Sequence, residues 1–460
     1  MRGILIVVFS CFCSQAFAQH TESQLDSLFN KLYAEGKFNG NVLVAQKGQV
    51  LYQRSFGMAR LDQKRPLNKE SIFELASVSK QFTAMGIMIL KKKGALSYED
   101  SLRNFFPELP YEQITIRHLL NHTSGLPDYM ELFEEYWDSS KIATNRDMIG
   151  LLAQYKPKIL FNPGEKYEYS NTGYALLASI IEKASGKSYG KFLDEAIFKP
   201  LKMSNTLVLS RRFDNKVPEN YAYGYVKQKT DNTFILPDEH PDYKAFVKAL
   251  DGIQGDGTVN STTGDLFLWD RALHDHALLT QEEWFEALQT PVLKNGKKSF
   301  YGFGWMVDSS KTFGRIMNHS GSWPGYNTFI ERHTDNDKAF ILLSNMERGS
   351  LPYIAIRRIL YHLQNNQPQP AIKLSADSLK QYKGKYTLAP DFVLTIWVEN
   401  EKLLAQATGQ TSFILTPEKT DWFIIPEVSA KIQFIRNDTG LVRSLVLYQN
   451  GQEVPGEKTE

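Results

Sequence analysis

The spacing of apolar residues predicts a region of mixed helices and strands, followed by a region of short strands. Apolar residues recur at helical spacing over Glu22–Leu32. Two apolar runs, Val42–Ala45 and Val50–Tyr52, flank a turn-forming stretch and predict a β-hairpin. The run over about Lys80–Lys92 predicts a helix that is apolar on nearly every side, so it should be buried.

The rest of this region changes from helical to extended patterns. Residues 100–200 are typical of helices joined by loops with Gly and Pro, whereas residues 301–345 predict strands. A helix is expected around Leu351–Leu363. The expected strands are Gly302–Val307, Tyr326–Ile330 and Ala339–Leu343.

A polar stretch with two prolines, residues 364–370, is the clearest linker in the chain. Beyond it, six short apolar runs separated by turns predict a small sandwich or barrel. These runs are Phe392–Val398, Lys402–Gln406, Ser412–Leu415, Trp422–Ile425, Lys431–Ile435 and Leu441–Leu447.

The composition excludes several classes of protein. A chain of 460 residues is too long for one average core, so two domains are expected. Its 42% hydrophobic and 23% charged residues are typical of a folded soluble protein. The net charge of +2 predicts no strong field for nucleic acid or an anionic membrane. No apolar stretch approaches the roughly 18 residues of a transmembrane helix.

The first 18 residues combine a basic start, a short apolar run over Ile4–Phe12 and the small-residue end Ala16–Ala18. This pattern predicts a signal peptide cleaved before Gln19, and hence a periplasmic or extracellular protein. Both cysteines, Cys11 and Cys13, would leave with it, so the mature chain would have no disulfide and no Cys metal site. The alternative is that Cys11 is lipidated and becomes the N-terminus of the mature protein. The short apolar run before Cys11 disfavours this alternative.

The Ser-x-x-Lys pattern occurs twice, at Ser77–Lys80 and Ser188–Lys191, and about two matches are expected by chance. Ser77 lies where an extended segment meets the buried helix, whose start offers free N–H groups and a positive dipole end. Lys80 follows on the same face, and apolar walls should ease loss of its proton, so it could deprotonate Ser77. Ser188 lies in a polar, solvated turn. We therefore expect Ser77 to be the nucleophile.

Two further motifs carry groups that suit the same chemistry. In Tyr169-Ser170-Asn171, a phenol near an ammonium would be stabilised as phenolate and could shuttle protons, while the amide could hold the lysine and a substrate. His319-Ser320-Gly321-Ser322 is expected between two strands, where small residues let a substrate approach the backbone. The N–H groups of Ser77 and Ser322 could form an oxyanion hole. Each motif alone is weak, because an ordinary loop tyrosine or a structural histidine explains it equally well.

The three motifs, in this chain order, resemble the serine β-lactamase and penicillin-binding protein superfamily, most closely its class C-like branch. The resemblance covers roughly residues 20–363 and includes the stretch Ile114–Pro127. It implies an α+β fold, with a β-lactamase/transpeptidase-like antiparallel sheet flanked by helices, a helical subdomain, and a small barrel-like all-β domain after it. The expected divisions are a signal peptide over 1–18, a hydrolase domain over 19–363, a linker over 364–370 and the β domain over 371–460.

The resemblance also implies a role for each predicted site residue. These are Ser77 as nucleophile, Lys80 and Tyr169 as the proton-transfer pair, Asn171, His319, Gly321 and Ser322 as substrate contacts, and the N–H groups of Ser77 and Ser322 as the oxyanion hole. Either member of the pair could be the general base. Class C β-lactamases carry lysine where this chain has His319, whereas carboxypeptidase and D-aminopeptidase relatives carry histidine, so efficient β-lactam hydrolysis is not expected.

The expected function is a secreted serine hydrolase that forms an acyl-enzyme on an amide or ester. Its substrate would be a small molecule or short peptide containing a D-amino acid, such as one derived from peptidoglycan. The alternatives are a carboxylesterase or weak β-lactamase of the same branch and, in a different class, a catalytically silent relative that binds peptidoglycan or a partner. Residues Gly186–Gly190 match the nucleophile-elbow pattern of an α/β-hydrolase, but no strand is predicted to lead into them. The zinc-binding pattern H-E-x-x-H does not occur in the sequence. We therefore expect no cofactor and no metal; the sequence gives no signal for an oligomeric state.

Overall fold

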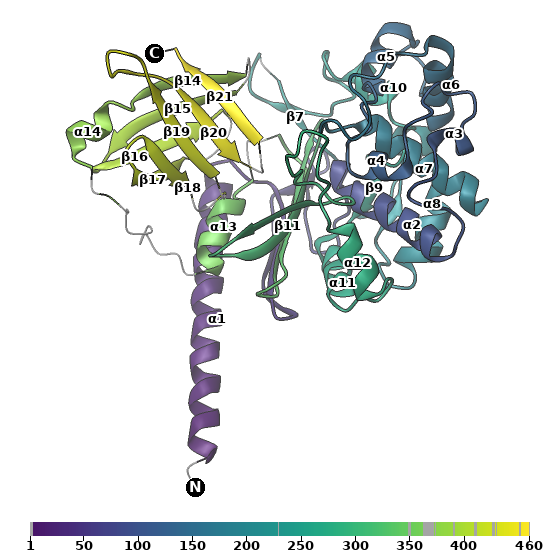
Figure 1. Ribbon diagram of the computed structural model, residues 1–460. Coiled ribbons are helices and arrows are strands. Elements are labelled where there is room, and N and C mark those ends of the chain that lie inside the picture. Colours follow the sequence, from purple (N-terminus) through teal and green to yellow (C-terminus); the bar gives the residue numbers. More distant parts are fainter. Residues whose placement is uncertain are drawn as a thin grey trace. The chain divides into compact units, whose positions relative to one another are not determined.

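The computed structural model divides the chain into two compact units, which we describe separately (Figure 1). One unit comprises Leu32–Val307 and Arg315–Arg348, and the other Met1–Lys31, Asp308–Gly314 and Gly349–Glu460. The described residues are 3–228, 230–347, 351–361, 372, 374–389, 392–408, 412–425, 428, 430–449 and 452–459, with the backbone alone for 3–18 and 452. The expected linker over 364–370 lies outside them.

A six-stranded sheet, with the order β10-β11-β12-β13-β1-β2, positions one wall of the site. The strands from β11 to β2 in this order pair antiparallel. Their bounds are Met306–Ser310 (β10), Gly314–Trp323 (β11), Tyr326–His333 (β12), Lys338–Ser344 (β13), Gly40–Gln46 (β1) and Gln49–Phe56 (β2).

The expected hairpin is confirmed as β1 and β2. Lys47 and Gly48, at its turn, have φ values of +50° and +71°. Positive φ at both central residues is the geometry whose twist matches that of the flanking strands. The central strands β1 and β13 are buried along nearly their whole length, which is why both are continuous apolar runs in the sequence.

The expected buried helix is confirmed as α2 (Lys80–Lys92), in which every residue from Lys80 to Leu90 is buried. It packs against α7 (Asn171–Ser185), and Figure 1 shows α2, α4 (Ile116–Leu120) and α7 gathered together. A Cβ on Gly86 of α2 would lie 2.8 Å from Ile181 of α7, so the glycine lets the two helices approach closely. This pairing brings the N-terminal ends of both helices to one site.

Two predictions about strands differ from the structure. The strand expected over Gly302–Val307 begins only at Met306, because Gly304 has a φ of +77° and a Cβ there would lie 2.9 Å from the backbone of α2. The motif from His319 to Ser322, expected between strands, lies within β11. Its run of Ser and Gly residues carries no apolar alternation that would reveal a strand.

The smaller unit contains a closed barrel of eight antiparallel strands, which confirms the expected small barrel-like β domain. Pairing of Tyr386 with Lys458 joins its first strand to its last. The strands are Gly384–Ala389 (β14), Phe392–Glu399 (β15), Lys402–Ala407 (β16), Phe413–Lys419 (β17), Trp422–Ile425 (β18), Ala430–Arg436 (β19), Val442–Gln449 (β20) and Gln452–Lys458 (β21). The prediction missed β14 and β21, which are short or rich in charge, Gly and Pro.

Three helices of the described residues lie wholly or mostly in this unit, one of which is α14 (Ala376–Lys380). The helix expected from Glu22 is part of α1 (Gly3–Ala34), and the one expected around Leu351–Leu363 is α13 (Tyr353–Leu360). In the part of the chain that the structure describes, no helix has the length and apolarity that a membrane span requires.

Candidate active site

Ser77 lies in a single 3₁₀ turn, η1 (Ala76–Ser79), between the short strand β5 (Phe73–Glu74) and α2. The expected position of Ser77 at the start of a helix is thus confirmed, except that the 3₁₀ turn precedes the α-helix. Ala76, directly before it, has a φ of +48°, a conformation that costs a non-glycine residue about 1–2 kcal/mol. This residue turns the extended chain sharply into the helix and presents Ser77 to solvent at the turn.

Lys80 is fully buried at the start of α2. Its Nζ lies 3.1 Å from the Oγ of Ser77, and it donates to the Oδ1 of Asn171 at 2.9 Å and the backbone oxygen of Asp256 at 2.8 Å. Burial lowers the pKa of Lys80 to about 8, although Asp256 and Asp128 oppose the shift. The ammonium is therefore held rigidly and loses its proton more easily than an exposed lysine.

Tyr169 lies on the other side of Lys80, whose Nζ is 4.9 Å from the centre of the phenol ring. Burial raises the pKa of Tyr169 well above its ordinary value, and the nearby hydroxyl of Ser77 offsets only part of that rise. Desolvation therefore opposes the phenolate that the sequence suggested for Tyr169 and favours the neutral phenol.

His122 holds the Tyr169 motif in place, and the sequence analysis did not single it out. Its ring stacks on Tyr169 at 4.3 Å between centres, and its Nδ1 accepts from the backbone N–H of Ser170 at 3.0 Å. Ser170 in turn caps α7 by accepting from the N–H of Gly173, which places Asn171 in the first turn beside Lys80. The quoted stretch Ile114–Pro127 contained this histidine, but no spacing rule linked it to Tyr169.

Gly321 brings strand β11 against the turn that carries Ser77. A Cβ on Gly321 would lie 2.2 Å from the backbone oxygen of Leu75 and 3.1 Å from the nitrogen of Ser77, so only glycine fits there. Thr328, its partner on β12, donates to the same oxygen of Leu75 at 2.7 Å. Ser322 follows Gly321 and lines the same cleft as Ser77.

His319 is buried in this wall, and both ring nitrogens are bonded within the protein. Nδ1 lies 2.7 Å from the carbonyl oxygen of Ser320 and Nε2 lies 2.7 Å from the hydroxyl of Tyr301. Burial and the charge of Lys80 lower the pKa of His319 to about 3, so the ring is neutral. Because a carbonyl only accepts, Nδ1 carries the proton and Nε2 accepts from Tyr301.

A cleft of about 550 Å³ opens beside Ser77 and brings together three of the predicted site residues, Ser77, Asn171 and Ser322. Three carboxylates also line it, those of Glu74, Asp251 and Asp256. Among the described residues, no cluster of three His, Cys, Asp or Glu side chains is placed to hold a metal ion.

The second Ser-x-x-Lys match is in a different environment. Ser188 is exposed at the N-terminus of α8 (Tyr189–Leu193), as the sequence predicted. Helix α7 leads into it, so the strand that an α/β-hydrolase elbow needs is absent from this described segment.

Comparison with known proteins agrees with the family resemblance found in the sequence. Residues 25–363 match the family model described as Beta-lactamase, and residues 368–458 match the one described as Domain of unknown function (DUF3471). Penicillin-binding protein 4* of Bacillus subtilis (strain 168) is 42% identical over 451 residues, which cover 96% of this chain and 100% of that protein.

Two solved structures are similar over most of their length. The octameric penicillin-binding protein homologue from Pyrococcus abyssi shares the fold with a TM-score of 0.63 and 23% identity, covering 95% of this chain and 99% of that one. D-amino acid amidase from Ochrobactrum anthropi SV3, in complex with L-phenylalanine amide, has a TM-score of 0.59 and 25% identity, covering 76% and 97%. The family match over more than half of the chain, together with the Bacillus relative, shows that the chain belongs to the beta-lactamase family, as the resemblance in its sequence predicted.

Proposed function

We propose that the protein is a serine hydrolase that forms an acyl-enzyme on Ser77 and cleaves amides or esters of D-amino acids. The observation that carries the proposal is the position of Lys80, a buried lysine of lowered pKa whose Nζ lies 3.1 Å from the Oγ of Ser77. A base at hydrogen-bond distance from a serine hydroxyl is the arrangement that activates it as a nucleophile.

In the proposed reaction, the free amine of Lys80 takes the hydroxyl proton while the Oγ of Ser77 bonds to the substrate carbonyl carbon. The N–H groups of Ser77 and Ser322 bind the oxyanion of the tetrahedral intermediate. The carbon–leaving-group bond then breaks, and the proton held by Lys80 passes to the leaving group, directly or through the hydroxyl of Tyr169. Water attacks the acyl-enzyme by the reverse route, releasing the acid and returning the proton to Ser77.

Lys80 rather than Tyr169 is the general base in this proposal. Burial lowers the pKa of Lys80, which eases loss of its proton, and raises the pKa of Tyr169, which opposes deprotonation of the phenol. Tyr169 then acts as a hydrogen-bond donor and proton relay, and Asn171 orients Lys80 through its Oδ1.

The substrate class rests on similarity and on the wall of the cleft. The D-amino acid amidase, 25% identical, is a protein whose name states an amide of a D-amino acid as substrate. A β-lactamase-like site would need a cation for the substrate carboxylate, whereas His319 is neutral and bonded within the protein. These observations support an amide of an amino acid or short peptide over a β-lactam.

Export and domain division are part of the same proposal. We propose that residues 1–18 direct export to the periplasm or the outside of the cell, and that 19–363 and 371–460 are the two domains. The family matches over 25–363 and 368–458 support that division. Peptides derived from peptidoglycan are the proposed natural source of the substrate.

Covalent labelling tests the proposal. A fluorophosphonate probe should label the wild-type protein, and a mass shift should map to the peptide that contains Ser77. Ser77→Ala should lose both the label and hydrolysis of D-amino acid amides, whereas the matched control Ser188→Ala should keep both. An unlabelled wild-type protein would indicate instead a catalytically silent binding relative; labelling that persists in Ser77→Ala would move the nucleophile elsewhere.

A further inference from the structure

The carboxylates of the cleft differ in how they are satisfied by the protein. Glu74, Asp251 and Asp256 line the cleft, and none of the described lining residues is lysine or arginine. A buried charge is costly unless it is paired or hydrogen-bonded, so each of these groups requires a partner.

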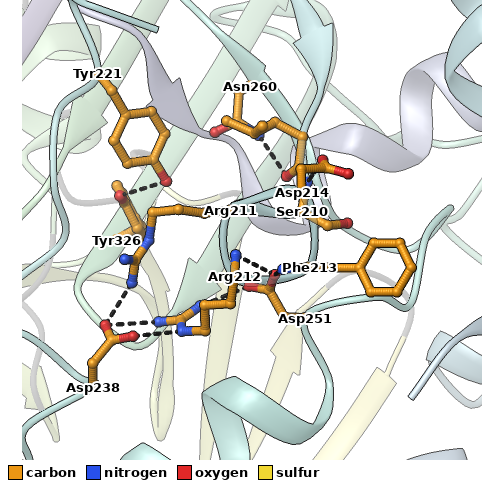
Figure 2. Close-up of polar contacts among 11 residues, drawn as sticks. Ser210, Arg211, Arg212, Phe213, Asp214, Tyr221, Asp238, Asp251, Asn260 and Tyr326 are labelled. Carbon is orange, nitrogen blue, oxygen red and sulfur yellow. Dashed lines mark hydrogen bonds and ion pairs between the residues drawn. The ribbon is translucent and has the colours of Figure 1, made fainter. Parts of the chain in front are cut away.

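Both carboxylate oxygens of Asp251 are hydrogen-bonded to Arg212 and Phe213, which lie in the short helix α9 (Arg211–Asp214) (Figure 2). One of its oxygens accepts from the Nη1 of Arg212 at 2.7 Å, and the other accepts from the backbone N–H groups of Arg212 and Phe213 at 2.7 and 2.9 Å. Arg212 also donates to both oxygens of Asp238. Arg211 donates one further hydrogen bond to one of these oxygens. Two arginines thus balance two aspartates, and this network holds the loop that carries Asp251.

The carboxylate of Asp256 also has partners within the protein. Its carboxylate accepts from the hydroxyl of Tyr129 at 2.9 Å, and the nearby ammonium of Lys80 opposes its charge. Lys80 is in turn bonded to the backbone oxygen of the same residue. Asp256 therefore has partners within the protein at its end of the cleft.

Glu74 has no hydrogen-bond or ion-pair partner within the described part of the chain. It is half-buried at the end of β5, three residues before Ser77, and is the one carboxyl group of the described lining without such a partner. Burial raises the pKa of Glu74 to about 7 even though Arg211 and Arg212 lie close enough to oppose the shift. A carboxylate without a partner beside the nucleophile can bind a cationic or hydrogen-bond-donating group of a ligand.

We infer that Glu74 is a specificity-determining residue that binds a substrate ammonium group in the Ser77 cleft. The cleft would then select amides and esters of amino acids with a free amino group, and would reject substrates that carry a carboxylate at that position. This inference rests on the proposed function, and it separates an aminopeptidase-like activity from a carboxypeptidase-like one.

A set of three p-nitroanilides tests the inference: D-alanine, N-acetyl-D-alanine and N-succinyl-D-alanine. Wild type should cleave the free amine with the highest kcat/KM and the succinyl compound with the lowest. In Glu74→Gln, kcat/KM for the free amine should fall about 10- to 100-fold, the value of a charge-assisted hydrogen bond, and the preference over the acetyl compound should disappear. Glu74→Lys should favour the succinyl compound. The matched control is Glu70→Gln, which removes an exposed carboxylate four residues away and should change none of these values.

Fluorophosphonate labelling of Ser77 separates the possible failures. Loss of labelling in the wild type would overturn the proposed function itself. A labelled Glu74→Gln that keeps the wild-type preference for the free amine would overturn only the role of Glu74. Should the variant fail to fold, the wild type provides the test: D-alaninol should slow its labelling more than propane-1,2-diol, which has a hydroxyl in place of the ammonium. Equal protection by the two compounds would overturn the inference.

Discussion

The Nζ of Lys80 and the Oγ of Ser77 are 3.1 Å apart across a single turn of the chain, and the lysine is completely buried. The same nitrogen is held by Asn171 and by the backbone of Asp256, which come from two other segments. Three segments therefore converge on one amine and fix it against one hydroxyl.

Lys80→Met should keep the fold and lose most of the acyl transfer. Methionine has a similar length and lacks a buried charge, so the desolvation cost of the ammonium disappears while two acceptors, on Asn171 and Asp256, lose their donor. We expect fluorophosphonate labelling to slow by about 10²–10⁴, with a thermal unfolding temperature close to that of the wild type. Labelling at the normal rate would remove Lys80 from the chemistry.

Activity should rise with pH through about 8. Only the free amine of Lys80 accepts a proton, and with a pKa of about 8 roughly one tenth of it is deprotonated at pH 7. The measurement is kcat/KM for an uncharged ester between pH 6 and 9.5, made in Glu74→Gln so that the carboxyl of pKa about 7 does not contribute. A profile that is flat over this range would contradict the assignment of the base.

His122→Phe should lower kcat without raising KM for a neutral ester. Phenylalanine preserves the stacking on Tyr169 but leaves the N–H of Ser170 without its acceptor, at a cost of about 1–3 kcal/mol in the free energy of unfolding. We expect kcat to fall about 10-fold as Tyr169 and Asn171 lose their position. His122→Asn is the informative companion, because asparagine tolerates the φ of +56° found there. Equal kcat in His122→Phe and wild type would show that His122 is only structural.

Gly321→Ala should be far more damaging than its single methyl group suggests. The added carbon would lie 2.2 Å from the backbone oxygen of Leu75, so β11 must move away from the Ser77 turn and spoil the oxyanion site. We expect a loss of 10²-fold or more in kcat, about the effect of removing one oxyanion donor. Gly150→Ala, on an exposed helix position with no atom within 4 Å, is the control and should stabilise the protein by about 0.5–1 kcal/mol. Similar kinetics in both variants would contradict the proposed role of Gly321.

Local patterns in the sequence were sufficient to predict the features that depend on neighbouring residues. The hairpin at Lys47-Gly48, the buried helix α2 and the placement of Ser77 at a helix start all follow from periodicity and spacing. The exposed position of Ser188 follows from the polarity of its neighbours.

Features that depend on distant segments could not be predicted in this way. Burial by parts of the chain remote in sequence opposes deprotonation of Tyr169, whereas its closeness to Lys80 in the predicted site suggested a phenolate. The hydrogen bond that fixes the ring of His319 comes from Tyr301, which lies 18 residues earlier in the chain and outside the motif. Glu74 stood three residues from Ser77 in the sequence, yet its significance appears only when the arginine pairs of Asp251 are known.

The pairing of Tyr386 with Lys458 has a consequence for how the barrel is made. Strand β14 comes first in the chain and β21 last, so the sheet remains open until the final strand has paired. Until then β14 and β20 each present unpaired backbone groups, the kind of edge that recruits other chains. Pairing of the closing strand β21 therefore removes both edges at once, and the barrel loses its exposed edges only when that strand has joined.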